Sequence, residues 1–200
     1  MEGRALVREA TAPPVRLFET EEEVRSVSTL KTPTGPVGVF PFLDVSGEDL
    51  LSSQERIVFL HGVQDPGNVG TVVRTAHAFG AGVALSKGCA DLYNPKTVRA
   101  TMGSIFHAPV ARELETVEFM RRAVAAGFTT AAAVPEGGEA PSTVFGGRVV
   151  VVVGAEGSGL PPEVVEGCDT RVSVPSRAAS LNAAVAAAIL LYEAHMRVLG

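Results

Sequence analysis

A run of five valines, Val149 to Val153, constrains the fold more than any other feature of this sequence. A strand in which every residue is apolar is typical of a parallel sheet that is buried on both faces. Shorter apolar runs at 56–60, 83–85, 128–134 and 171–174 alternate with segments of helical periodicity. This alternation predicts a three-layer α/β domain with a parallel sheet, and with ligand-binding loops at the carboxyl ends of the strands.

Helices are predicted from apolar spacing and from the residues at their ends. Pro95 suits the first turn of a helix, and Gly127 suits the position after the last turn. The expected helices span 68–79, 95–105, 115–126 and 181 onward, with a short one from Pro161-Pro162. In the helix at 115–126, the apolar positions expected to face the core are Val117, Met120 and Val124. In the helix from 181 onward, they are Leu181, Val185, Ala188 or Ile189, Tyr192 and Met196.

Residues 1–50 are predicted to form a small α+β unit ahead of the main domain, which we place at 56–200. A turn rich in proline and glycine at 32–36 leads into one of its strands. The polar stretch from Gly47 to Glu55 is expected to link the two parts. The elements expected in the small unit are helices at Gly3–Ala10 and Glu21–Val27 and strands at Val15–Phe18 and Val37–Phe42.

Composition restricts the class of protein. No stretch of eighteen apolar residues occurs, so a soluble cytoplasmic protein without a membrane partner is expected. Cys89 and Cys168 form no Cys-x-x-Cys pair and the histidines lack metal-ligand spacing, so neither a disulfide nor a metal site is expected. The balance of 17 basic to 22 acidic residues argues against indiscriminate nucleic-acid binding, but leaves room for a local basic site.

Three polar or glycine-rich segments follow predicted strands, and we expect them to form one composite site. The first runs from Asn68 to Arg74, and the second from Gly154 to Leu160. The third joins Val174-Pro175 to Ser180-Leu181-Asn182 at the start of the last helix. Glycine allows backbone groups to approach a ligand closely, because no Cβ stands in the way.

The glycines do not match the common nucleotide and hydrolase motifs. Gly154, Gly157 and Gly159 stand in the reverse order of the dinucleotide fingerprint, and no phosphate-binding Walker sequence is present. Ser158 lacks the flanking glycines of a nucleophile elbow. Taken singly, each loop is better explained as an ordinary turn after a strand than as a cofactor site, but the joint occurrence of the loops with Asn68, Arg74, Glu156, Ser180 and Asn182 favours a site.

As a set, these segments resemble the SpoU branch of the SPOUT methyltransferases, also called the TrmH family. The similarity extends over residues 56–200 and includes the stretch from Asn94-Pro95-Lys96 to His107. It implies an enzyme that methylates ribose 2′-hydroxyls in ribosomal or transfer RNA, with S-adenosylmethionine as the methyl donor and no metal. It also implies a homodimer, a C-terminal trefoil knot and a truncated N-terminal unit that resembles ribosomal protein L30e.

The resemblance assigns roles to individual residues. Arg74 is expected to anchor an RNA phosphate and to stabilise the forming alkoxide, because a guanidinium keeps its proton at neutral pH and makes a poor base. Glu156 is expected to hold Arg74 or Asn182, and Asn68 to orient Arg74 or the ribose. The residues expected to be catalytic are Asn68, Arg74, Glu156, Ser180 and Asn182, and those expected to bind the donor are Gly154, Glu156, Gly157, Gly159, Leu160, Val174, Pro175, Leu181 and Asn182.

Simpler readings stay open for some of these residues and for the whole chain. Asn68 and Ser180 could each be a plain helix N-cap. The loop Ser176–Ala179 is shorter than the family's and lacks its glycine, which leaves a catalytically silent RNA- or ribosome-binding relative as the first alternative. A nucleotide- or NAD-binding α/β module is the second.

Overall fold

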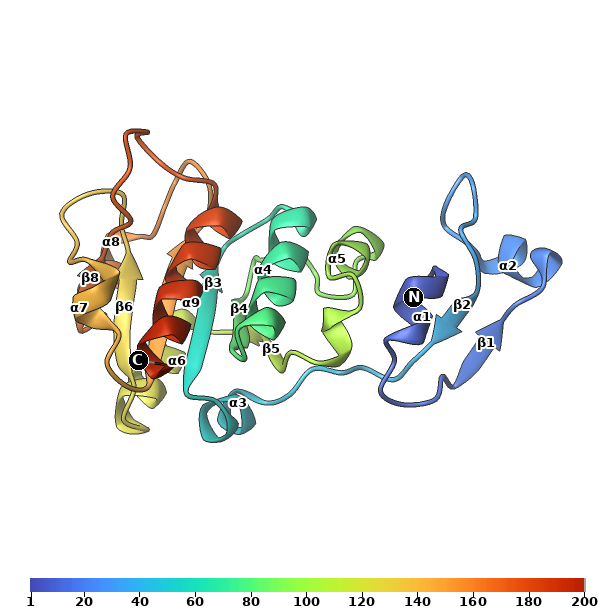
Figure 1. The fold of residues 1–200 in the computed structure, drawn as a ribbon, viewed down its shortest axis with the longest axis horizontal. Coiled ribbons are helices and arrows are strands. Elements are labelled where there is room, and N and C mark those ends of the chain that lie inside the picture. The colour runs from blue at the N-terminus through green and yellow to red at the C-terminus, as the bar shows by residue number, and fades with distance from the viewer. Residues whose placement is uncertain (200) are drawn as a thin grey trace.

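A six-stranded parallel sheet forms the centre of the structure, a computed structural model in which residues 1–199 are described (Figure 1). Its strand order is β5-β4-β3-β7-β6-β8. The direction in which successive strands are added reverses between β3 and β7, and ligands commonly bind at such a point in parallel α/β sheets. The strands are β3 (Arg56–His61), β4 (Gly82–Ser86), β5 (Val110–Leu114), β6 (Thr129–Ala133), β7 (Val149–Gly154) and β8 (Thr170–Val172).

The valine strand β7 lies in the middle of this sheet, between β3 and β6. Alternate side chains enter two separate cores, because successive residues of a strand point to opposite faces. Val149, Val151 and Val153 pack in one core, and Val150 and Val152 in the other. The prediction of a parallel sheet buried on both faces is confirmed.

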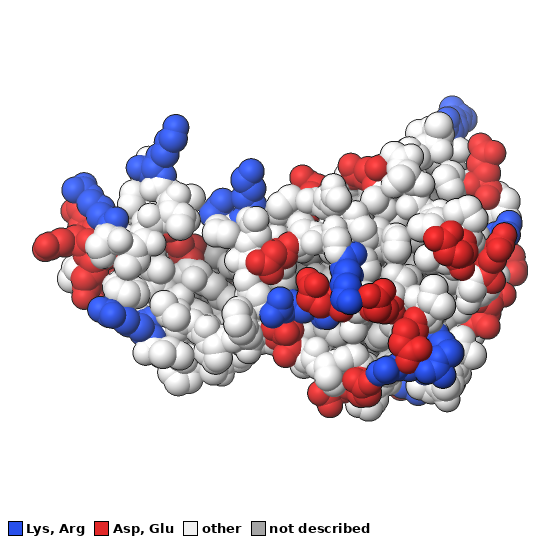
Figure 2. Space-filling model, turned by 180° about the vertical axis from the view of Figure 1, so that it is seen from behind, with Lys and Arg blue, Asp and Glu red and all other residues white. Residues whose placement is uncertain are grey.

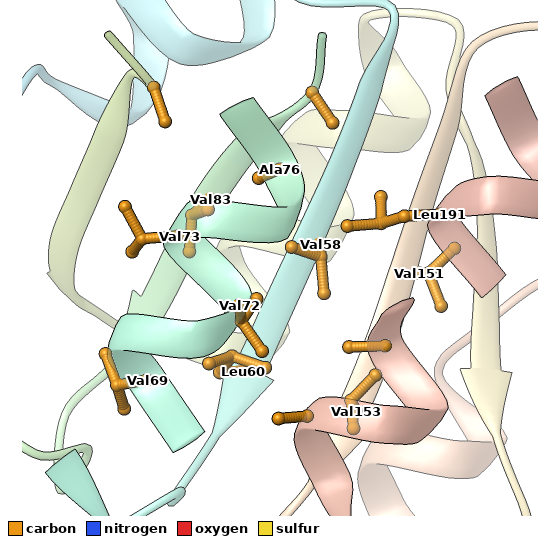
Figure 3. Packing of buried hydrophobic residues seen from close by; sticks show 14 of the residues in the cluster. Val58, Leu60, Val69, Val72, Val73, Ala76, Val83, Val151, Val153 and Leu191 are labelled. Carbon is orange, nitrogen blue, oxygen red and sulfur yellow. The ribbon is translucent and has the colours of Figure 1, made fainter. Parts of the chain in front are cut away.

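Helices cover both faces of the sheet. The first core lies beneath α4 (Pro66–Ala78), α5 (Pro95–Ala100) and α9 (Ala183–Leu199). Figure 3 shows Val69, Val72, Val73 and Ala76 of α4 packed against β3 and β4, with Leu191 of α9 beside Val151. The second core includes side chains from α3 (Gly47–Ser53), α6 (Thr116–Ala125) and α8 (Pro162–Glu166). A 3₁₀ turn at Ser104–Phe106 and α7 (Pro141–Val144) complete the main part of the structure.

The N-terminal residues form a small unit at one end of the molecule, beyond α5 (Figure 1). It consists of α1 (Arg4–Arg8), β1 (Arg16–Phe18), α2 (Glu21–Val27) and β2 (Val37–Val39), and its two strands pair in antiparallel fashion. Leu6 is buried in the first core of the main sheet. The α+β content expected for this unit is therefore observed.

The stretch expected to be a polar linker is instead the helix α3. Ser46 caps it by accepting a hydrogen bond from the backbone N–H of Asp49 at 3.0 Å. Leu50 and Leu51 are buried in the second core. The two leucines anchor the helix among polar neighbours, so the composition of the segment was a poor guide to its structure.

The predicted inner faces of two helices are wrong in part. In α6 the predicted Met120 is buried, together with Thr116, Phe119 and Ala123, whereas Val117 and Val124 are exposed. In α9 the predicted core stripe is half-buried at Leu181, Ala188 and Ile189 and exposed at Val185, Tyr192 and Met196. The residues of α9 that are buried are Ala183, Ala184, Ala187, Leu190, Leu191 and Ala194. Four alanines and two leucines thus form the inner face of α9, and the small alanines allow the helix to approach the sheet and α4 closely, whereas Val185, Tyr192 and Met196 face outward.

Other boundaries also differ from expectation. The helix expected over 95–105 ends at Ala100, and the chain then turns through Met102 and Gly103, both at positive φ. Strand β5 was not predicted, because its sequence mixes apolar and charged residues at the edge of the sheet. Among the described residues, no helix has the length and apolar character that a membrane span requires.

Candidate functional site

A pocket of about 550 Å³ opens at the carboxyl ends of β6, β7 and β8. The loop that follows β7 and the segment that leads into α9 form its walls. Most residues expected to bind a donor line it: Gly154, Glu156, Gly157, Gly159, Leu160, Val174, Leu181 and Asn182, together with Ser180. Pro175 is not among the lining residues. Two of the three predicted segments therefore enclose one cavity.

Glycines give the loop after β7 its shape. A Cβ on Gly154 would overlap the carbonyl group of Gly159 and lie 2.6 Å from the backbone nitrogen of Leu160. Gly157 and Gly159 adopt φ angles of 84° and 66°, in the left-handed region that favours glycine. The N–H of Gly159 donates to the carbonyl of Ala155 at 2.9 Å. The loop therefore folds back on itself and presents its backbone to the pocket.

Glu156 connects all three predicted segments by hydrogen bonds. Its Oε1 accepts from Nδ2 of Asn68 at 2.8 Å, from the backbone N–H of Ala183 at 3.3 Å, and from Nδ2 of Asn182. Nδ2 of Asn182 also donates to Oδ1 of Asn68 at 3.2 Å. The carboxylate lies at the N-terminus of the 17-residue helix α9, where the helix dipole favours negative charge. The network spans the point between β3 and β7 at which the strand order reverses.

The helix caps in this site are not the residues expected from the sequence. Asp65 caps α4 by accepting from the N–H of Asn68 at 2.8 Å, which leaves the Asn68 amide free for Glu156. Asn182 caps α9, since its Oδ1 accepts from the N–H groups of Ala184 and Val185 at 3.0 and 3.2 Å. The capping readings of Asn68 and Ser180 are therefore wrong, and Asn182 both caps its helix and joins the network.

Arg74 lies outside this network. Its side chain is exposed on α4 and does not line the pocket. Within residues 1–199 it has no hydrogen bond or ion pair. Of the two partners expected for Glu156, Asn182 is in contact with it and Arg74 is not; Asn68 likewise contacts Glu156 and Asn182 rather than Arg74.

Sequence reasoning missed one part of the pocket wall, formed by Ala133, Val134 and Pro135 at the end of β6. Ala133 and Val134 end a predicted strand and Pro135 follows it, so the rule that located the other loops could have found them. Ser176, Ala178 and Ala179, within the third predicted segment, also line the pocket. In the part of the chain that the structure describes, no group of three or more His, Cys, Asp or Glu side chains is arranged to hold a metal ion.

Comparison with known proteins identifies the family. The model of the SpoU rRNA Methylase family matches residues 55–192. The chain belongs to this family. The match includes every strand of the central sheet and all three segments of the SpoU site, and it confirms the resemblance read from the sequence.

Named relatives of this SpoU chain act on ribosomal RNA. It is 38% identical over 154 residues to the 23S rRNA (guanosine(2553)-2′-O)-methyltransferase RlmP of Bacillus subtilis, a match that covers 75% of this chain and 61% of RlmP. The chain thus spans about three fifths of the length of that relative. It is also 34% identical over 172 residues to the 23S rRNA (uridine(2479)-2′-O)-methyltransferase of Streptomyces viridochromogenes, covering 80% of this chain and 60% of that protein.

A solved structure shares the SpoU fold closely. The AdoMet-bound rRNA methyltransferase of Sinorhizobium meliloti superimposes with a TM-score of 0.81 at 36% identity, over 90% of this chain and 71% of that one.

Proposed function

We propose that this SpoU family member transfers a methyl group from S-adenosylmethionine to a ribose 2′-hydroxyl of ribosomal or transfer RNA. The observation that carries the proposal is the convergence on Glu156 of three segments that are far apart in the sequence, beside a pocket at the strand ends. Support also comes from relatives that are named as 23S rRNA 2′-O-methyltransferases and from a similar fold solved with AdoMet bound.

The pocket fits a nucleoside-sized donor. Its volume of about 550 Å³ is within the usual range of ligand sites. In this proposal, the backbone of Gly154, Gly157 and Gly159 contacts the donor, and Leu160, Val174 and Leu181 pack against its adenosine. Glu156 and Asn182 complete the donor site, whereas Pro175, which does not line the pocket, would act only by holding Val174 in place. When bound, the donor supplies an electrophilic methyl group on a sulfonium.

The residues of the chain would position the ribose and stabilise its charge. Asn68, Glu156 and Asn182 hold one another, and Ser180 contacts the ribose or the donor carboxylate at the start of α9. Arg74 is exposed and free of ion pairs among the described residues, which suits an anchor for an RNA phosphate. From that position its guanidinium stabilises the forming alkoxide. The carbon–sulfur bond of the donor breaks as the methyl–oxygen bond forms, S-adenosylhomocysteine leaves, and the 2′-hydroxyl proton passes to the RNA phosphate that Arg74 anchors. The in-line arrangement of the ribose oxygen, the methyl carbon and the sulfonium then contributes most of the rate of methyl transfer.

A methyl-transfer assay tests the proposal. The protein is incubated with methyl-labelled S-adenosylmethionine and ribosomal or transfer RNA, and the RNA is digested and analysed for 2′-O-methylnucleosides. We expect one modified position, and we expect Arg74→Ala to abolish transfer while donor binding persists. Donor binding without transfer to any RNA would instead indicate the catalytically silent relative. Absence of donor binding together with a thermal shift by NAD or ATP would favour the nucleotide-binding module.

We further propose that the chain acts as a homodimer and that its C-terminal segment forms the family's trefoil knot. The support for a dimer is the row of exposed apolar side chains on α9, Val185, Tyr192 and Met196, together with half-buried Ile189. Exposed apolar patches of this kind commonly mark interaction sites. The knot is proposed from family membership.

The N-terminal unit is proposed to be a shortened relative of the L30e-like domain that contacts RNA. Its exposed basic residues are Arg4, Arg8, Arg16, Arg25 and Lys31, and Figure 2 shows basic side chains standing out from this end of the molecule. The division into a unit of 1–50 and a methyltransferase domain of 56–200 is part of this proposal.

A further inference from the structure

A second pocket, of about 300 Å³, lies between the N-terminal unit and α5. Val27, Val39 and Phe42 line it from one side, and each of them is exposed. Val98 and Arg99 of α5 line it from the other. Apolar side chains from separate elements thus remain uncovered around one small hollow, which is typical of a binding surface.

Phe42 is the most exposed of these apolar residues, at 73%. Its backbone is nevertheless fixed, because the N–H groups of Leu43 and Asp44 donate to Oη of Tyr93 at 2.6 and 2.9 Å. That hydroxyl in turn donates to Oδ1 of Asp44 at 2.6 Å. The centroids of the Phe42 and Tyr93 rings are 4.7 Å apart. The Arg112 guanidinium carbon lies 5.4 Å from the centroid of the Phe42 ring. An aromatic ring is therefore held in place and left open to solvent.

The pocket is lined by charges of both signs, and the cation among the side chains from α5 has no acidic partner in the described part of the chain. Arg99 lines it and, within residues 1–199, makes no side-chain hydrogen bond or ion pair; Lys96, three residues earlier in α5, is exposed and equally free. The carboxylate of Glu2 also lines the pocket, but it accepts from Oγ of Ser28 at 2.9 Å and from the N–H of Thr34 at 3.2 Å. Arg112 is paired with Asp44 at 3.1 Å.

The pocket is adjacent to the proposed catalytic helix. Gly70 of α4 packs so closely on α5 that a Cβ there would lie 2.5 Å from Ala100 Cβ and from the carbonyl oxygen of Thr97. Thr97 and Ala100 thus face α4, whereas Val98 and Arg99 face the second pocket. The helix α5 thus lies between the second pocket and the helix that carries Asn68 and Arg74.

We propose that this pocket binds one unpaired base of the substrate RNA, stacked on Phe42, while Arg99 and Lys96 contact the flanking phosphates. The inference rests on the proposed function and specifies how the RNA is recognised. Every nucleobase has a π-face that stacks on an aromatic ring, and proteins recognise RNA chiefly through unpaired bases. A volume of about 300 Å³ is at the small end of ligand pockets and suits one base better than a segment of folded protein.

The test uses the full chain and an RNA hairpin with 2-aminopurine in its loop, whose fluorescence falls when the base stacks. We expect quenching with the unaltered protein, and no quenching when the same RNA is annealed to its complement. Phe42→Ala should remove the quenching and raise the Kd about 5- to 100-fold, the usual effect of losing one stacked base. Phe42→Trp should retain binding, and Phe42→Leu, which is apolar but not aromatic, should lose most of it.

Val117→Ala is the control, since Val117 of α6 is an apolar residue exposed to 61% that does not line the pocket. It should leave the Kd unchanged, and all variants should keep the melting temperature of the unaltered protein. Equal affinity of Phe42→Ala and the unaltered protein, or equal affinity for the hairpin and the duplex, would overturn the inference. In the methylation assay, Phe42→Ala should raise KM for RNA at an unchanged kcat. Failure of the unaltered protein to methylate any RNA would contradict the proposed function and leave the stacking result standing.

Discussion

At the scale of single residues, the candidate site depends on Glu156. One carboxylate oxygen accepts from Asn68, Asn182 and Ala183, which come from two helices far apart in the sequence. The sequence located Asn68, Glu156 and Asn182, because each follows a strand or begins a helix, but it did not indicate Ala183. It did not predict their contacts, since the distance between Asn68 and Asn182 depends on how closely α4 and α9 pack.

Replacing Glu156 tests whether this network positions the reacting groups. Glu156→Ala removes the shared acceptor and should lower kcat/KM for methyl transfer about 100-fold, the usual effect of a small misplacement. Glu156→Gln keeps an oxygen in place but loses the charge, so its loss should be smaller. The control is Glu163→Ala, an exposed glutamate on α8, which should leave kcat/KM unaltered. Equal activity of Glu156→Ala and the unaltered protein would show that the network is dispensable.

Tyr93 gives the molecule a pH dependence that can be measured. Burial, followed by its hydrogen bond to Asp44, raises the pKa of Tyr93 to about 12, above the unfolded value of about 10. Its contribution to folding is therefore fully present below about pH 10 and is lost as the pH rises through about 12. Tyr93→Phe should remove this contribution, and at pH 7 it should lower the free energy of unfolding by about 1–3 kcal/mol, because two backbone N–H groups lose their acceptor.

Urea unfolding of the two proteins at several pH values provides the measurement. The stability difference between the unaltered protein and Tyr93→Phe should be constant up to about pH 10 and shrink above it. A difference that stays constant up to pH 12 would contradict this account of Tyr93.

At the scale of elements, the strands were easier to predict than the faces of the helices. The valine run predicts the parallel sheet, and the glycine-rich turns that follow the strands predict the edge of the sheet at which a ligand binds. The predicted faces of α6 and α9 are wrong in part, because apolar spacing alone does not distinguish neighbouring stripes on one helix. In α6 the inner face includes Phe119 and Met120 rather than Val117 and Val124, and in α9 it includes Leu190, Leu191 and four alanines. The edge strand β5 lacks an apolar run, and α3 buries two leucines among polar residues.

Close helix packing at Gly70 gives a prediction at this scale. A Cβ at this position would meet Ala100 Cβ and the Thr97 carbonyl at 2.5 Å, so α4 and α5 would have to separate. Gly70→Ala should therefore lower the free energy of unfolding by about 1–3 kcal/mol, as overpacking usually does. Gly147→Ala is the control, because nothing lies within 4 Å of the added Cβ. Equal urea midpoints for the two variants would show that the α4–α5 contact relaxes without cost.

At the scale of the whole molecule, the exposed apolar face of α9 predicts self-association. Val185→Lys places a charge on this face and should convert a dimer into a monomer in sedimentation velocity at micromolar concentration. Val124→Lys is a closely matched control, since Val124 of α6 is exposed to 45% and Val185 to 47%. Dissociation by both variants, or by neither, would show that α9 does not form the interface.

The central claim is that the loop after β7 and the start of α9 build a site for the methyl donor. Calorimetric titration of S-adenosylmethionine into the unaltered protein, Gly154→Ala and Gly147→Ala tests it most directly. A Cβ on Gly154 would displace Gly159 and Leu160 and should weaken donor binding about 5- to 100-fold, whereas Gly147→Ala should bind like the unaltered protein. No heat of binding to the unaltered protein, or equal affinity for Gly154→Ala, would contradict the account.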